Sequence, residues 1–106
     1  MSRYLLIESR SPWEAGDVTY FYGLARDLAG AGNEVTLFLV QNGVLPARKG
    51  ADSPLGSVGS KVKVLADDFS LRERALKPDS LLPGVTVSGM ETVVDLLAGG
   101  AKAVWH

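Results

Sequence analysis

The chain has 106 residues, of which 46% are hydrophobic and 22% charged, so it has the size and composition of one ordinary globular domain, placed at residues 1–106. Its net charge of −1 excludes the basic surface that nucleic acids and anionic membranes attract, and no apolar run approaches the roughly 20 residues that cross a bilayer. The absence of cysteine excludes disulfides, thiolate catalysis and thiolate metal sites, and it favours a cytoplasmic location.

The first part of the chain predicts a strand, a helix and a second strand. Residues 4–7 form an uninterrupted apolar run, which is typical of a strand covered on both faces of a parallel sheet. A helix is expected over residues 12–31, because Ser11 and Glu14 form a capping box in front of it. Residues 34–40 predict the second strand and are the most hydrophobic stretch of the protein.

The middle of the chain predicts a strand that leads directly into a helix. A helical turn is expected near residues 44–48, and an irregular, glycine- and serine-rich segment follows as far as residue 60. Residues 62–66 carry the aliphatic side chains of a buried strand, and residues 69–76 have helical spacing. In α/β folds, such a junction between a strand and a helix is where binding sites are usually found.

The last part predicts a fourth strand at 85–87, a helix over 89–98 and a final strand at 103–105. Ser88 and Glu91 are expected to cap this helix, with four apolar side chains facing inward: Met90, Val93, Val94 and Leu97. Five short strands alternating with helices predict an α/β fold, a three-layer α/β/α sandwich with a five-stranded, mainly parallel sheet.

Polar residues follow three of the predicted strands. Glu8 follows the first strand, Asn42 and Gly43 the second, and Asp67 and Asp68 the third. Because ligands of open parallel sheets bind beyond the carboxyl ends of the strands, these five are the candidate ligand-binding residues. The three carboxylates could together hold Mg²⁺, but we favour the alternative that Asp67 or Asp68 caps the helix that follows.

Other features of the sequence give no sign of catalysis. His106 is the single histidine and the last residue, so a frayed tail is expected there, and Trp13 is expected to pack over the edge of the sheet. No glycine pattern matches a nucleotide-binding loop, and no hydroxyl-rich phosphate loop for a flavin follows the first strand. We therefore expect no catalytic residue, no metal and no cofactor.

The sequence resembles the DsrE-like family, which includes the small subunits of bacterial sulfur-relay complexes. The resemblance covers nearly the whole chain and rests on YLLIES with its following helix, EVTLFLVQNGV, VKVLADDFSLRERAL and AKAVWH. It implies a single DsrE-like domain, flavodoxin-like in general appearance, that assembles as a dimer, trimer or hexamer.

The resemblance fails at the position that carries the family's chemistry. The third strand of the family runs into a cysteine and then a helix that ends Arg-Gly-aliphatic, matched here by Arg74-Ala75-Leu76, which places the cysteine at about Asp67. Members with that cysteine carry sulfur as a persulfide, and some subunits without it act as structural partners. Because only a thiolate can form a persulfide, covalent sulfur transfer is not available to this chain.

Three functions remain open. The first is a non-catalytic DsrE-like subunit or binding module, associated with sulfur-relay proteins as a homo-oligomer or beside a cysteine-bearing DsrE-like partner. The second is a small-molecule or metal-binding protein that uses the polar edge formed by Glu8, Asn42, Asp67 and Asp68. The third and weakest is a hydrolase with Asp67 as its base, because no nucleophile motif accompanies it.

Overall fold

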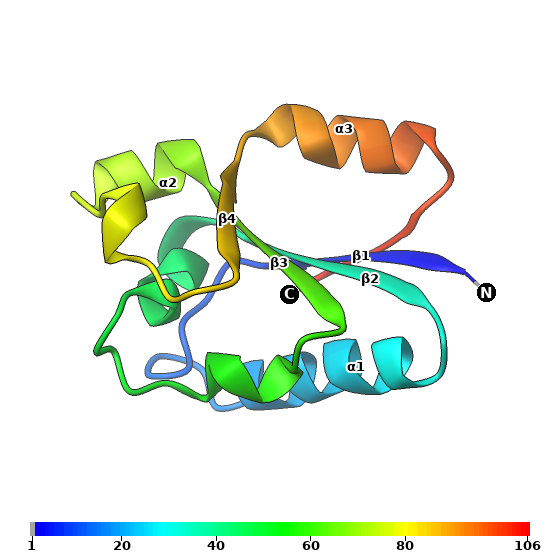
Figure 1. The fold of residues 1–106 in the computed structure, drawn as a ribbon, viewed down its shortest axis with the longest axis horizontal. Helices are drawn as coiled ribbons and strands as arrows, with labels where there is room; N and C mark the ends of the chain where they lie inside the picture. The colour runs from blue at the N-terminus through cyan, green and yellow to red at the C-terminus, as the bar shows by residue number, and fades with distance from the viewer. Residues whose placement is uncertain (1) are drawn as a thin grey trace.

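A five-stranded, all-parallel sheet with the strand order β4-β3-β2-β1-β5 forms the centre of the protein (Figure 1). The structure, a computed structural model, describes residues 2–106. The strands are β1 (Arg3–Glu8), β2 (Glu34–Leu39), β3 (Val62–Asp67), β4 (Val85–Ser88) and β5 (Lys102–Trp105). The helices are α1 (Val18–Gly30), α2 (Asp68–Glu73) and α3 (Met90–Ala98), and the 3₁₀ segments are η1 (Gln41–Ala47), η2 (Pro54–Val58) and η3 (Pro78–Ser80).

Helical segments cover both faces of the sheet. Figure 1 shows α1 and the short green segment η2 along one face, and α2 and α3 along the other. The core is larger on the α1 side, where Val18, Tyr22 and Ala25 pack against the inner strands, and smaller on the α3 side. Most residues of the three inner strands are buried on both faces, which explains why these strands are mainly apolar. The predicted three-layer sandwich is confirmed.

The first helix begins later than its sequence predicts. The backbone N–H of Ser11 donates to Oε1 of Glu14 over 2.8 Å, so part of the expected capping box forms, but only turns follow it. Gly16 disfavours helix at this point, and α1 starts only after Asp17, whose carboxylate caps no backbone N–H. Trp13 consequently lies on this leading turn and is exposed, so its predicted packing over the sheet is wrong.

Helix α3 is only partly covered by the rest of the protein. Gly89 precedes it without any side-chain cap, and Oγ of Ser88 lies 2.6 Å from Oγ1 of Thr92, so the predicted capping box is wrong. Of the four apolar side chains expected to face inward, Val93 alone is buried. Because the helix lies over the β1 side of the sheet, one apolar stripe remains exposed: Met90, Val94 and Leu97.

All three helices end in the same type of left-handed turn. Gly32 after α1 and Gly100 after α3 have φ values of 94° and 91°, which glycine adopts easily. Ala75 occupies the equivalent position after α2 with φ of 55°, and the N–H of Leu76 donates to the carbonyl of Leu71 over 2.9 Å. The left-handed turn explains why α2 stops at Glu73, earlier than the predicted residue 76.

The segment expected to be irregular is ordered against α1. Oγ of Ser53 accepts a hydrogen bond from the N–H of Leu55 and so starts η2. Leu55 and Val58 are buried in the larger core, which fixes this connection beside α1 on the same face of the sheet. Within residues 2–106, no helix is long and apolar enough to cross a membrane.

Candidate functional site

The five candidate residues lie at the strand ends in three separate groups. Glu8 contacts the C-terminal residue, Asn42 joins η1 to the end of α2, and Asp67 begins α2. Asp68 points to solvent and pairs with Arg72 at 3.5 Å. The described part of the chain contains no cluster of three His, Asp or Glu side chains that could hold a metal ion, so Glu8, Asp67 and Asp68 do not form a shared metal site.

The Glu8 carboxylate is fully buried and bound to the His106 imidazole. Nδ1 of His106 lies 2.8 Å from Oε1 and 2.9 Å from Oε2 of Glu8, and the N–H of Arg10 donates to Oε2 over 3.1 Å. Burial raises the pKa of the Glu8 carboxyl, while the hydrogen bonds from His106 and Arg10 oppose that rise. The hydrogen bond from His106 is therefore the main interaction that stabilises the ionised form of the buried Glu8 carboxyl.

Side-chain and backbone contacts fix His106 in place, so the expected frayed tail is wrong. Its Nε2 lies 2.8 Å from Oδ2 of Asp17, and its ring stacks on Phe21 with the centroids 5.1 Å apart. The backbone N–H of His106 donates to the carbonyl of Ile7 over 2.8 Å. The backbone carbonyl of His106 accepts from the backbone N–H and from Oγ of Ser9. Hydrogen bonds to Asp17 and Glu8 raise the pKa of the imidazole, and the bond from His106 lowers the pKa of Asp17.

The phenol of Tyr22 completes this group of titratable side chains. Tyr22 is fully buried on α1, and among the described residues its hydroxyl has no hydrogen-bond partner. Burial, together with the nearby charge of Glu8, raises the pKa of this phenol far above its usual range. The hydroxyl therefore stays protonated at any ordinary pH.

Asn42 and Gly43 have structural roles beside this group. Oδ1 of Asn42 accepts from Nη2 of Arg74 over 3.0 Å and from Nε over 3.2 Å, which ties η1 to the end of α2. Gly43 packs against the backbone of Glu8, and a Cβ there would collide with the Glu8 carbonyl oxygen. Glycine is thus required at position 43 by a close backbone approach.

Asp67 is the N-cap of α2, as the sequence predicts. Its Oδ2 accepts from the N–H of Ser70 over 2.9 Å and from Oγ of Ser70 over 2.7 Å. Oγ of Ser70 accepts in turn from the N–H of Gln41 over 2.8 Å. Gln41 has φ of 52°, a strained value for a residue with a side chain, and this hydrogen bond holds it there.

A pocket opens beside this network, at the carboxyl ends of the strands. This strand-end pocket has a volume of about 330 Å³ and is lined by the buried Val40, Asp67 and Ser70 and by the exposed Phe69, Met90 and Trp105. Gln41 and Glu73 line it as well. Asp67, Ser70 and the backbone N–H of Gln41 are hydrogen-bonded to one another, whereas the aromatic and methionine side chains are exposed. The pocket is therefore suited to an apolar occupant.

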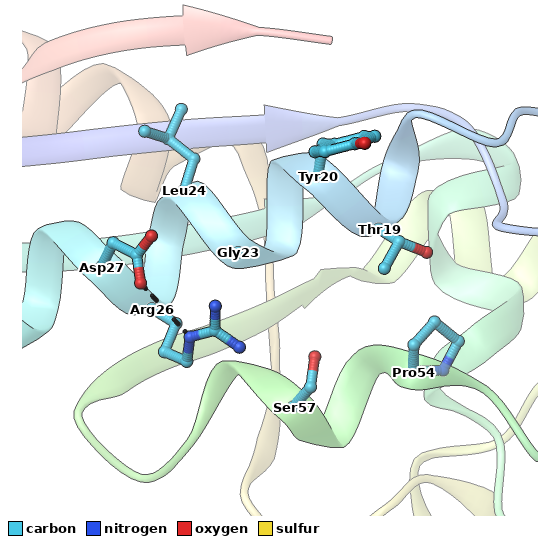
Figure 2. A pocket seen from close by; sticks show the side chains of 8 residues that line it. All are labelled: Thr19, Tyr20, Gly23, Leu24, Arg26, Asp27, Pro54 and Ser57. Atoms are coloured by element: carbon cyan, nitrogen blue, oxygen red, sulfur yellow. Dashed lines mark hydrogen bonds and ion pairs between the residues drawn. The ribbon is translucent and has the colours of Figure 1, made fainter.

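A larger groove lies on the opposite face, between α1 and η2. It has a volume of about 770 Å³, and Figure 2 shows Tyr20 and Leu24 on α1 above Pro54 and Ser57 of η2, with Gly23 between them. Among the described residues, the charged side chains that line it are Arg26 and Asp27, which pair with each other at 3.3 Å. The groove holds no buried polar group, so the strand-end pocket is the better candidate.

Sequence reasoning missed the residues that complete both groups. His106 is brought to Glu8 by the pairing of β5 with β1, and no local pattern indicates which strands are neighbours. Trp105, Met90 and Phe69 look like core residues in the sequence, but in the structure they are exposed and line the strand-end pocket. A weak signal was available for Phe69, since it follows the end of a predicted strand, and ligands of open α/β sheets bind beyond the carboxyl ends of the strands.

Comparison with known proteins supports the fold. No family model and no curated protein matches the sequence. Two solved structures match over 100% of both chains: the protein of unknown function MTH1491 from Methanobacterium thermoautotrophicum, with a TM-score of 0.83 at 21% identity, and the ychN protein from E. coli, with a TM-score of 0.88 at 14% identity. At these identities the chain shares with both proteins the α/β sandwich fold.

Proposed function

We propose that this protein is a non-catalytic DsrE-like subunit of the cytoplasm, a module that binds a partner protein through the strand-end pocket. One observation carries the proposal. Asp67 stands where the resemblance places a sulfur-carrying cysteine, and both hydrogen bonds of its Oδ2 go to Ser70. A carboxylate cannot form a persulfide, and this one is occupied in starting a helix. The proposed site therefore has a pocket that a partner could enter, but it has no group that could form a persulfide.

The lining of the pocket favours a protein partner. Phe69, Met90 and Trp105 are 60%, 49% and 62% exposed, although side chains of this kind are usually covered. Covering them would yield roughly 25 cal/mol for each Å² of apolar surface removed from water. Tryptophan in particular is enriched among the residues that dominate protein interfaces, and methionine adapts its shape to a partner.

The exposed stripe of α3 extends the same surface. Val94 and Leu97 follow Met90 along the helix and are 62% and 47% exposed. Contiguous exposed apolar side chains of this kind are characteristic of interaction surfaces. The partner we propose is a cysteine-bearing DsrE-like subunit or a second copy of this chain, with an apolar side chain that enters the strand-end pocket.

Native mass spectrometry of the protein purified gently from its own host tests this proposal. We expect a complex with a second subunit, and we expect Trp105→Ala to weaken it at least tenfold, because the indole forms a wall of the pocket. Trp13→Ala is the matched control: Trp13 is 57% exposed but does not line the pocket, so the complex should survive.

Two results would contradict the proposal. A bare monomer in every gentle preparation would leave the pocket without a partner. A complex that tolerates Trp105→Ala and Phe69→Ala as well as Trp13→Ala would locate the interface elsewhere.

The volume of the pocket supports a second candidate function, the binding of a small molecule. About 330 Å³ lies at the lower end of the range found for ligand sites, about 300 to 1,000 Å³. In the same experiment, an additional small mass on the protein that disappears in Trp105→Ala would support this function over the first. No observation favours a metal, because Asp67 is bound to Ser70 and Asp68 to Arg72.

A further inference from the structure

We propose that Glu8, His106 and Asp17 form a clamp, controlled by one proton, that holds Trp105 in place as a wall of the strand-end pocket. The clamp itself stands on contacts within the chain. Its consequence for partner binding rests on the function proposed above. The proposal assigns a regulatory role to the only histidine of the protein, which the proposed function does not use.

The geometry requires two donors on one imidazole ring. Nδ1 of His106 lies within 2.9 Å of both carboxylate oxygens of Glu8, and Nε2 lies 2.8 Å from Oδ2 of Asp17. With both carboxylates ionised, each nitrogen must carry a hydrogen, so the ring must be the imidazolium cation. The two charge-assisted hydrogen bonds then join β1, the start of α1 and the end of β5.

Loss of the proton breaks one of these two contacts. A neutral imidazole has one N–H, and its other nitrogen turns a lone pair toward a carboxylate. Glu8 is fully buried and would be costly to leave with only backbone N–H donors such as that of Arg10, whereas the side chain of Asp17 is 61% exposed and can be solvated by water. We therefore expect the neutral ring to keep its bond to Glu8 and release Asp17.

Among the groups that surround the ring, His106 is the one whose ordinary pKa lies near neutral pH. On α1, the buried Tyr22 phenol stays protonated, and Phe21 stacks on the ring without charge. After β1, Arg10 carries a fixed positive charge that favours the ionised form of Asp17, and Ser9 supplies uncharged donors. Asp17 and Glu8 both raise the pKa of the imidazole, so the clamp opens above the ordinary histidine range.

The clamp acts on Trp105 because the two residues are adjacent at the end of a short strand. Trp105 pairs with Ile7 in β5, which is an edge strand that pairs with β1 alone. His106 fixes this end through its N–H to the carbonyl of Ile7 and through its carbonyl, which accepts from Ser9. Release of Asp17 leaves these contacts and the bond to Glu8 in place but removes the hydrogen bond that ties residue 106 to the start of α1, so we expect the last pair of β5 and the neighbouring indole to become more mobile.

The test follows the two residues in one sample of tag-free protein. Because the chain has a single histidine, the imidazole NMR signal reports its titration directly, and in a Trp13→Phe background the fluorescence reports Trp105 alone. We expect both signals to change with one shared midpoint above the ordinary histidine pKa of about 6.5.

Variants of the carboxylates separate the clamp from a general effect of pH. Asp17→Asn keeps the shape of the exposed partner and removes its charge, so both midpoints should fall together, on the order of half a pH unit. Glu8→Gln should lower them as well. Asp27→Asn is the matched control, because this exposed carboxylate on α1 pairs with Arg26 and has no contact with His106, and it should change neither midpoint.

Two outcomes would overturn the clamp: fluorescence of Trp105 that stays constant while His106 titrates, or midpoints that Asp17→Asn leaves unchanged. Binding of the partner, measured on both sides of the midpoint, tests the link to function separately. A clamp that titrates in a protein without any partner contradicts only the proposed function. Partner affinity that does not depend on pH contradicts only the link between them.

Discussion

Glu8 and His106 are separated by 98 positions in the sequence, and yet Oε1 of Glu8 lies 2.8 Å from Nδ1 of His106. This contact joins the end of β1 to the end of the chain and buries one carboxylate behind an imidazole. Because both groups have pKa values that folding raises, the contact links the stability of the protein to pH.

We predict that the free energy of unfolding is highest at mildly acidic pH and falls toward alkaline pH. A raised pKa for His106 gives stability that is complete below the unfolded value of 6.5 and lost as pH rises through the folded value. The raised pKa of Glu8 acts in the same direction above 4.5, and the lowered pKa of Asp17 removes stability only in strong acid, below 3.8.

Urea unfolding from about pH 5 to about pH 9 measures this dependence. His106→Asn should be less stable than the natural protein at the acidic end, and the part of the decline above about pH 6.5 that titration of His106 causes should disappear, leaving only the part due to Glu8. Stability that is constant or rises across that interval in the natural protein would contradict the prediction.

Replacement of Asp67 should destabilise the protein through the start of α2. Asp67→Ala removes the acceptor for both the N–H and Oγ of Ser70, and a lost cap of this kind costs about 1 to 2 kcal/mol. Asp68→Ala removes only an exposed pair with Arg72 and should cost no more than about 0.5 kcal/mol. Equal losses in the two variants, measured by chemical unfolding, would show that the cap is not the reason.

A glycine at position 75 should stabilise the protein. Ala75 has φ of 55° in the turn that ends α2, where the other two helices have Gly32 and Gly100. Relief of the left-handed strain should make Ala75→Gly more stable by about 1 kcal/mol, and the reverse change Gly100→Ala should cost a similar amount. A loss of stability in Ala75→Gly would mean that contacts of the Ala75 Cβ stabilise the protein by more than the left-handed conformation costs.

Two other glycines should respond in opposite directions to the same substitution. Gly43→Ala places a Cβ against the Glu8 carbonyl oxygen and should cost about 1 to 3 kcal/mol, because the backbone must move. Gly23→Ala lies on the open side of α1, where the nearest atom is an Arg26 nitrogen at 3.6 Å, and should stabilise the helix by about 1 kcal/mol. Thermal midpoints would distinguish the two, and similar shifts would contradict the assignment of Gly43 to a close approach.

Most of the fold could be predicted because the apolar composition of each inner strand identifies it without information from the rest of the chain. Most residues of 34–39 and 62–67 are buried on both faces, so these segments are mainly apolar and can be recognised as strands from their composition alone. The helix boundaries were less certain because they depend on competing contacts. The side chain of Asp17 binds His106 instead of capping α1, and the exposed apolar side chains of α3 follow from how little of the sheet faces that helix.

Only those contacts of the candidate site that join residues close together in the sequence could be predicted. The Asp67 cap spans three residues and belongs to a known sequence preference. The partner of Glu8 could not be found this way, because strand order decides that β5, and no other strand, lies beside β1. Long-range pairing of this kind leaves no periodic trace in the sequence.

The two edges of the sheet are its shortest strands. β4 and β5 each have four residues, whereas the three strands between them have six. A foreign strand that extended the sheet would therefore gain few backbone hydrogen bonds at either side, a feature that limits edge-to-edge aggregation. The association that we propose uses instead the uncovered side chains of α2, α3 and Trp105, where contact with a partner would depend on the shape of both surfaces.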